Sequence, residues 1–118
     1  MENGVIQKPG FDWYKIENET WNSLNENELK EVSIAGKQIG ILKQKEKLHA
    51  FAANCPHAGI PLCSGWLDAQ GRIVCPKHKF RFDPANGRNT SGEGYKLYTY
   101  ASAVRGNELW VYMSGGTF

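Results

Sequence analysis

The stretch CPHAG at residues 55–59 places a thiol and an imidazole one residue apart, with a proline between them. The stretch CPKH at residues 75–78 repeats this arrangement with one extra residue. A proline fixes φ and has no N–H, so it stiffens a loop that carries ligands. Two soft thiolates and two imidazoles are four good ligands for a borderline or soft metal. The pattern Cys-x-His-x17-Cys-x2-His therefore indicates a metal centre.

Length, charge and cysteine usage narrow the class of protein. We expect one domain over residues 1–118, because a chain of this length builds a single core. A net charge of +2 without a long Lys/Arg run gives no indication of nucleic-acid binding. Neither an export signal nor a run of the ~18 apolar residues that span a bilayer is found, so we expect no membrane contact and a cytoplasmic protein. An odd number of cysteines, three, cannot form a complete disulfide framework.

The distribution of apolar residues predicts an all-β fold. Short apolar runs are separated by 13 glycines and five prolines, which is typical of a sandwich or barrel. Expected strands cover residues 13–16, 48–53 and 72–74, two strands joined at 35–37 within 32–44, and a hairpin formed by 98–104 and 109–113. A short polar helix is predicted over residues 22–30, and residues 1–10 and 114–118 are expected to be loose ends.

Four interpretations of the Cys–His pattern remain open from the residues alone. Chance placement does not account well for two similar Cys–Pro–His groups. A catalytic Cys–His pair would use one group and leave the second unexplained. Structural zinc accepts two Cys and two His, but such sites usually begin with two cysteines about two to four residues apart. A 2Fe–2S centre in which two His replace two Cys on one iron explains both halves, and the pattern favours it.

Three groups of residues resemble the Rieske family of iron–sulfur proteins. They are CPHAGIPL at 55–62, CPKH at 75–78, and Phe82-Asp83 followed by Gly87. The resemblance covers roughly residues 32–113. It implies an all-β, Rieske-type β-sandwich with a small three-stranded cluster-binding subdomain.

The resemblance also implies a cofactor and its ligands. One 2Fe–2S cluster per chain would be clamped by loops at about residues 54–66 and 74–84. By resemblance, the ligands are Cys55 and Cys75 on the inner iron and His57 and His78 on the outer, solvent-facing iron. Such a centre is uncharged when oxidised, whereas four thiolates would make it dianionic. Its potential is therefore expected ~250 mV or more above that of plant-type ferredoxins.

Two aromatic residues bear on the potential within that range. High-potential relatives place a serine and a tyrosine just after the second histidine, and their hydroxyls donate to cluster sulfur. Phe80 and Phe82 occupy those positions and cannot donate. The missing hydroxyls favour a reduction potential in the lower half of the range of Rieske proteins, towards ~−150 mV.

Three further positions depart from the family pattern or remain ambiguous. Membrane-bound relatives join the two loops by a disulfide, but here Cys63 has Lys77 at the opposing position, so we expect Cys63 to be a small buried or half-buried side chain. Relatives usually have glycine directly after the second histidine. Lys79 would be strained there at positive φ, so the loop is expected to differ locally. Together with Arg81, the two lysines form either a solvated loop or a docking patch for an acidic partner.

The resemblance implies a soluble Rieske-type ferredoxin, which is an electron-transfer protein and not an enzyme. It would be a monomer that carries single electrons from a ferredoxin reductase to a terminal oxygenase or similar redox enzyme. Rieske oxygenases add a mononuclear iron domain, for which this sequence shows no spare His/His/carboxylate set. The alternatives are a tightly bound small subunit of a nitrite-reductase-like complex and a zinc-stabilised interaction module.

Overall fold

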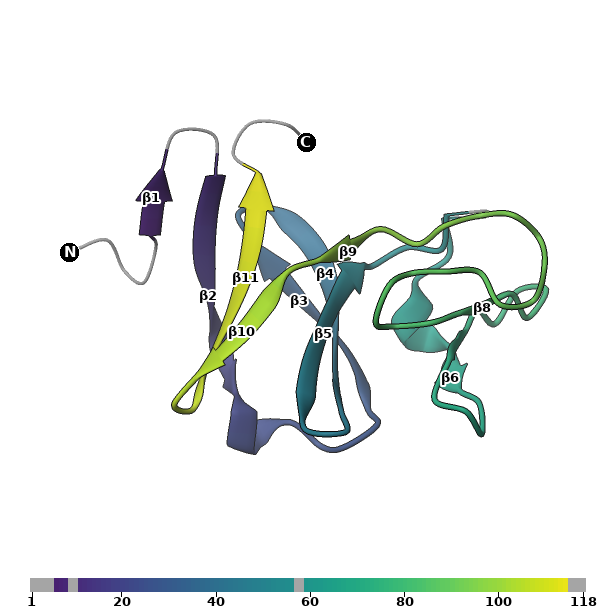
Figure 1. Ribbon diagram of the computed structural model, residues 1–118, viewed down its shortest axis with the longest axis horizontal. Helices are drawn as coiled ribbons and strands as arrows, with labels where there is room; N and C mark the ends of the chain where they lie inside the picture. Colours follow the sequence, from purple (N-terminus) through teal and green to yellow (C-terminus); the bar gives the residue numbers. More distant parts are fainter. Residues whose placement is uncertain (1–5, 9–10, 57–58, 115–118) are drawn as a thin grey trace.

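The computed structural model describes residues 6–8, 11–56 and 59–114, which form strands and two short 3-10 helices (Figure 1). In chain order the elements are β1 (Ile6–Lys8), β2 (Phe11–Thr20), η1 (Trp21–Ser23), β3 (Leu29–Ile34), β4 (Lys37–Gln44), β5 (Lys47–Ala52), η2 (Leu62–Ser64), β6 (Trp66–Leu67), β7 (Ile73–Val74), β8 (Arg81–Phe82), β9 (Thr99–Tyr100), β10 (Ser102–Arg105) and β11 (Glu108–Ser114). Within these ranges the structure holds no helix with the length and apolarity that a bilayer crossing requires.

The strands form two larger sheets and one small one. The larger sheets have four strands each, in the orders β1-β2-β11-β10 and β3-β4-β5-β9, and all their pairings are antiparallel. A three-stranded sheet, in the order β6-β7-β8, lies at one end of this sandwich (Figure 1). The sequence prediction of an all-β sandwich with a small three-stranded subdomain is confirmed.

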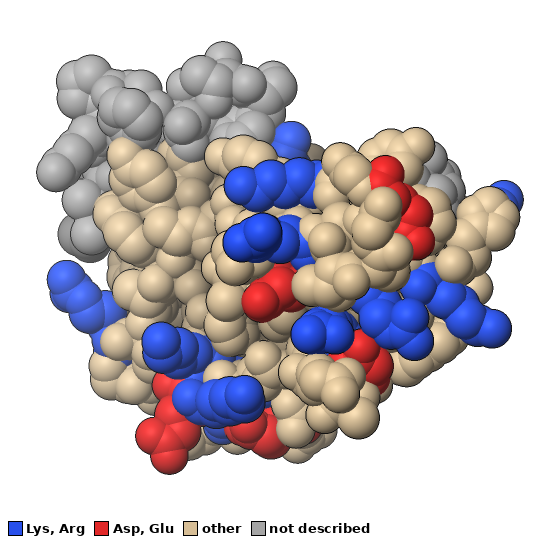
Figure 2. All heavy atoms as spheres, turned by 45° about the vertical axis from the view of Figure 1, so that its right-hand side comes forward, with Lys and Arg blue, Asp and Glu red and all other residues tan. Residues whose placement is uncertain are grey.

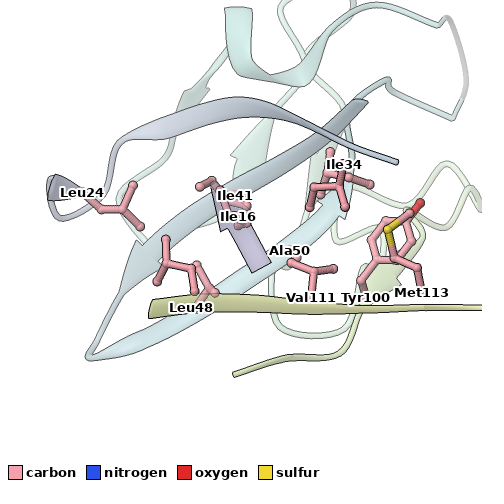
Figure 3. Packing of buried hydrophobic residues seen from close by; sticks show 11 residues of the cluster. Ile16, Leu24, Ile34, Ile41, Leu48, Ala50, Tyr100, Val111 and Met113 are labelled. Carbon is pink, nitrogen blue, oxygen red and sulfur yellow. The ribbon is translucent and has the colours of Figure 1, made fainter. Parts of the chain in front are cut away.

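The central strands β4 and β5 contribute side chains to two separate cores. Ile41 and Ala50 point into the sandwich, where side chains from both large sheets meet (Figure 3). The adjacent residues Leu42 and Phe51 belong to a second buried cluster, which they share with the subdomain. Successive strand residues point to opposite faces, so this sheet supports the sandwich on one side and the subdomain on the other.

A glycine makes room for the largest side chain of the second core. Gly40 pairs directly with Phe51 across β4 and β5. A Cβ added to Gly40 would lie 2.2 Å from the Phe51 ring, so no other residue fits there without displacing that ring. The ring of Phe51 belongs to the buried cluster that also contains Cys55, Cys75 and Phe82 of the subdomain.

Two tight turns confirm the predicted strand junctions in the second sheet. Ala35 and Gly36, between β3 and β4, have φ of +52° and +80°. Lys45 and Glu46, between β4 and β5, have φ of +52° and +63°. Two-residue loops with positive φ at both positions match the twist of the flanking strands.

The predicted helix over residues 22–30 is wrong. Thr20 caps the single turn η1 through reciprocal hydrogen bonds with Ser23, and β3 already begins at Leu29. The ammonium group of Lys43 donates to the carbonyl oxygens of Trp21 and Leu24 at 3.0 and 3.4 Å. Carbonyls that a helix would use internally are thus engaged by a side chain from β4, a contact that local sequence does not reveal.

The strand predictions at the two ends of the chain need correction. The segment 98–104 is not one strand, because β9 pairs with β5 in one large sheet and β10 pairs with β11 in the other. The first strand is longer than residues 13–16, since β2 covers ten residues. Residues 6–8 form β1 instead of a loose end, while residues 1–5, 9–10 and 115–118 lie outside the described residues.

Candidate metal centre

Each of the two Cys–His loops is closed by a backbone hydrogen bond from the N–H of its cysteine. In the first, the N–H of Cys55 donates to the carbonyl oxygen of Ile60 at 2.8 Å. In the second, the N–H of Cys75 donates to the carbonyl oxygen of Phe80 at 2.9 Å. In both loops the bond joins a cysteine to the fifth residue after it, so the described ends of the two loops are closed in the same way.

Each loop turns through a left-handed residue four positions after its cysteine. In the first loop this residue is Gly59, with φ of +70°, and in the second it is Lys79, with φ of +61°. His78 precedes it with φ of +78°. Residues with a Cβ are strained in this region. The expectation that the loop around Lys79 departs locally to avoid this conformation is wrong; the lysine takes the conformation that glycine takes in the first loop.

The two cysteines are buried together, and the second histidine is exposed. Cys55 and Cys75 are 2% and 0% exposed and belong to one buried cluster with Phe51 and Phe82. None of the chain's three cysteines, all of which are described, forms a disulfide. His78 lies on the surface. The structure therefore arranges two thiols on the inside and an imidazole on the outside.

This donor set is compatible with a metal cluster. Buried cysteines are also common as inert core residues, so burial by itself does not distinguish the two. Two thiols in one buried cluster, with an imidazole at the surface of the second loop, match the Cys/His division of a 2Fe–2S centre in which two His replace two Cys on one iron. Among the described residues, no group of three or more His, Cys, Asp or Glu side chains is placed to hold a metal ion. His57, the fourth predicted ligand, lies outside the described residues.

The third cysteine, Cys63, differs from the two predicted ligands in its surroundings. Its side chain is half-buried at η2, as the sequence analysis expects. Burial raises the pKa of the Cys63 thiol to about 11, and the nearby Glu31 carboxylate acts in the same direction. Without a metal, a thiol with this pKa is protonated at neutral pH and is a weak nucleophile.

His49, the remaining histidine, belongs to the sheet and not to the loops. It is half-buried in β5, opposite Leu42 of β4. Burial lowers the pKa of His49, because desolvation disfavours the charged imidazole, and the Asp83 carboxylate opposes this shift only in part. Its position in a paired strand is that of a structural residue.

One aromatic ring, that of Phe80, lies beside the exposed histidine. The ring of Phe80 lies 6.2 Å from the ring of His78 and 5.7 Å from that of Tyr95, centroid to centroid. Phe82 is fully buried, in the same cluster as the two cysteines. Neither phenylalanine carries a hydrogen-bond donor. Neither side chain can therefore supply the hydroxyl group that high-potential relatives place near the cluster.

A third loop, residues 89–94, is tied to the second Cys–His loop, which the sequence analysis did not foresee. The hydroxyl of Ser91 accepts from the N–H of Arg81 at 2.9 Å, and the amide of Asn89 donates to the Arg81 carbonyl at 3.1 Å. Arg81 is also fixed by its side chain, which donates to Asp68 at 3.1 Å. The polar, glycine-rich composition of this loop was the available sign of a turn that bonds to backbone.

Comparison with protein families gives one clear match. The family model described as "Rieske [2Fe-2S] domain" matches residues 12–100. This range runs from the second residue of β2 to the end of β9, and so includes both Cys–His loops and the third loop.

Individual relatives are more distant. The ferredoxin component of an alkene monooxygenase system from Xanthobacter autotrophicus is 21% identical over 90 residues, covering 76% of this chain and 74% of its own length. The ferredoxin of carbazole 1,9a-dioxygenase from Nocardioides aromaticivorans superposes with a TM-score of 0.75 at 24% identity, over 82% of this chain and 95% of its own. A Mycobacterium tuberculosis protein described as the small subunit of an NADH-dependent nitrite reductase gives 0.76 at 17% identity, over 87% and 96%. At these identities the structures show a shared fold.

Proposed function

The chain belongs to the Rieske [2Fe–2S] domain family, and on that premise we propose that it is an electron carrier, not a catalyst, which moves single electrons from a reductase to a terminal oxygenase or similar redox enzyme. One observation carries the proposal. The two thiols that would hold the inner side of a cluster are buried, whereas His78 lies on the surface. We propose that this electron transfer takes place in the cytoplasm, where thiols stay reduced.

The proposed ligands follow this division. Cys55 and Cys75 would hold the inner iron, and His57 and His78 the outer iron. The cluster, when bound, supplies reversible one-electron redox chemistry. The apolar surroundings of the two cysteines exclude water from the inner side, while the exposed imidazole of His78 provides the short route by which an electron reaches a docked protein.

We also propose that residues 1–118 form one domain. Strand β2, near the start of the chain, pairs with β11, near its end, in one sheet. Residues from both strands, Ile16 and Val111, lie in the same core as Ile41 of the second sheet. A boundary between these elements would cut through that core.

The shared fold with the nitrite reductase subunit supports a second candidate, a permanently bound electron-transfer subunit. Gel filtration of the protein purified from its native cells separates the two. A shuttle elutes at the mass of the chain, about 13.2 kDa, and a permanent subunit elutes with its partner. Partner identity then follows from the copurifying protein.

The cluster itself is tested on anaerobically purified protein by iron, zinc and acid-labile sulfide analysis together with electron paramagnetic resonance of the reduced form. We expect iron and sulfide in equal amounts, two of each per chain, and a spectrum typical of mixed His/Cys ligation. Zinc without sulfide would establish the interaction-module alternative, and four-thiolate ligation would overturn the ligand assignment. Potentiometry with a one-electron Nernst slope completes the test.

A further inference from the structure

The positive charge of the chain is concentrated in residues 75–98. This segment has five Lys and Arg residues against two acidic residues, whereas the rest of the chain has nine cations and ten acidic residues. The five cations are Lys77, Lys79, Arg81, Arg88 and Lys96. The segment therefore carries a net charge of +3 and the remainder a net charge of −1. It begins with the second Cys–His loop and continues through the third loop.

Within this segment, both acidic groups accept hydrogen bonds from neighbouring residues of the same chain, and the lysines are exposed. The Glu93 carboxylate accepts from the Asn89 amide and the Ser91 hydroxyl, and the Asp83 carboxylate accepts from the N–H of Ala85. Lys77, Lys79 and Lys96 are exposed. Figure 2 shows Lys and Arg side chains outnumbering Asp and Glu over the visible face on this side of the molecule.

The first Cys–His loop, in contrast, carries no charged side chain. Residues 54–66 contain no Lys, Arg, Asp or Glu. Pro56 and Pro61 are exposed, and Trp66 is 45% exposed although it is a large apolar side chain. The first loop therefore adds no charge to the cations of the second and third loops.

An exposed aromatic residue connects the basic segment to the predicted ligand. Tyr95 is 45% exposed, and its ring contacts Phe80, whose ring in turn contacts His78. Lys96 follows Tyr95 directly and is paired with Arg88 in a short antiparallel bridge. The aromatic side chain and the cations thus lie on one continuous surface beside the second Cys–His loop.

We propose that this tip of the subdomain is a docking surface for a protein partner whose own contact surface is acidic. The rings of Tyr95 and Phe80 would form the apolar centre, and Lys77, Lys79 and Lys96 the basic rim. Charges of this kind steer brief encounters, because they raise the association rate without burying large areas. The inference rests on the proposed electron-transfer function, since docking here would bring the partner to the exposed imidazole of His78.

The charge complementarity is tested by titrating the purified, cluster-loaded protein with poly-L-aspartate in a calorimeter at low salt. Two double variants remove the same net charge. Lys77→Gln with Lys96→Gln changes the proposed rim, and Lys15→Gln with Arg105→Gln changes the large sheet on the far side of the sandwich from the subdomain (Figure 1). We expect the rim variant to bind about tenfold more weakly and the control variant to change less than about twofold. Equal weakening in both would mean that binding follows net charge alone, and would overturn the proposal.

A second measurement separates this proposal from the proposed function. The reduced protein is mixed with hexacyanoferrate(III), an anionic oxidant that takes one electron from the chain and becomes hexacyanoferrate(II). We expect the rate to fall several-fold as salt rises and the Debye length shrinks from about 30 Å at 0.01 M to about 3 Å at 1 M, with a smaller fall in the rim variant. Fast but salt-independent transfer would refute the docking surface and leave the carrier function intact. Absence of any electron transfer would refute the carrier function, while the poly-aspartate titration would still decide the basic surface.

Discussion

Replacing Lys79 by glycine is expected to stabilise the protein. Lys79 has φ of +61°, in the left-handed region. A residue with a Cβ pays roughly 1–2 kcal/mol for this conformation, whereas glycine costs about 0.5–1 kcal/mol through the greater freedom that it loses on folding. The difference gives an expected gain of ~0.5–1 kcal/mol for Lys79→Gly.

The gain is measurable as a shift in the melting temperature. For a chain of 118 residues, an unfolding entropy of about 2.1 cal/mol/K per residue converts this gain to a rise of roughly 2–4 °C. Near-ultraviolet circular dichroism at one fixed scan rate provides the comparison, because unfolding of a protein that loses its cofactor is not a simple two-state equilibrium. The wild-type and variant proteins must carry equal iron.

A neighbouring lysine provides the matched control. Lys77 is exposed in the same loop and is not among the described residues with positive φ. Lys77→Gly therefore removes the same side chain and charge but gains no relief of strain, and should lower the melting temperature by a few degrees. If the two variants shift it by the same amount in the same direction, the backbone of Lys79 is not strained and the reasoning fails.

Four further predictions concern the potential, the thiol and the packing. His78→Cys, if the cluster survives, should lower the potential by ~100 mV or more, because an additional thiolate makes the centre more anionic; potentiometry measures it. Phe82→Tyr should raise the potential, because the new hydroxyl would lie in the buried cluster that contains Cys55 and Cys75, where it can donate to sulfur, and it should lower the melting temperature because the site is already fully packed. Cys63→Ala should retain full iron content, and in the wild-type protein Cys63 should resist iodoacetamide at pH 7, since burial raises its pKa to about 11. Gly87→Ala should destabilise the protein by about 2 kcal/mol or more, because the added Cβ would lie 1.9 Å from the Leu97 carbonyl oxygen at a φ of +77°; thermal unfolding measures the loss.

Each of these predictions has a contrary outcome. An unchanged potential in His78→Cys would remove this histidine from the outer iron. A potential unaffected by Phe82→Tyr, with the cluster intact, would mean that missing hydrogen bonds do not set it. Loss of iron in Cys63→Ala would make Cys63 a ligand, and normal stability of Gly87→Ala would contradict the close packing of that turn.

Much of the candidate site could be predicted from sequence because its chemistry is local. The types and spacing of the Cys–His residues predict a metal centre, and a glycine marks the turn at residues 35–36. These features depend on side-chain chemistry and on the φ values open to each residue. The alternation of apolar residues likewise predicts strands, since it reflects two faces in different surroundings.

Contacts between distant segments determined the rest. The segment 22–30 does not form one helix: its last two residues, Leu29 and Lys30, pair with β4, and Lys43 of the same strand donates to the carbonyl oxygens of Trp21 and Leu24. The segment 98–104 is divided between two sheets because strand pairing depends on which edges lie nearby, not on the segment's own composition. The left-handed turn at Lys79 follows from the hydrogen bond that closes its loop. Sequence alone specified which groups could bind a metal; only tertiary packing buried the two thiols together and left His78 at the surface, because burial is a property of the assembled core.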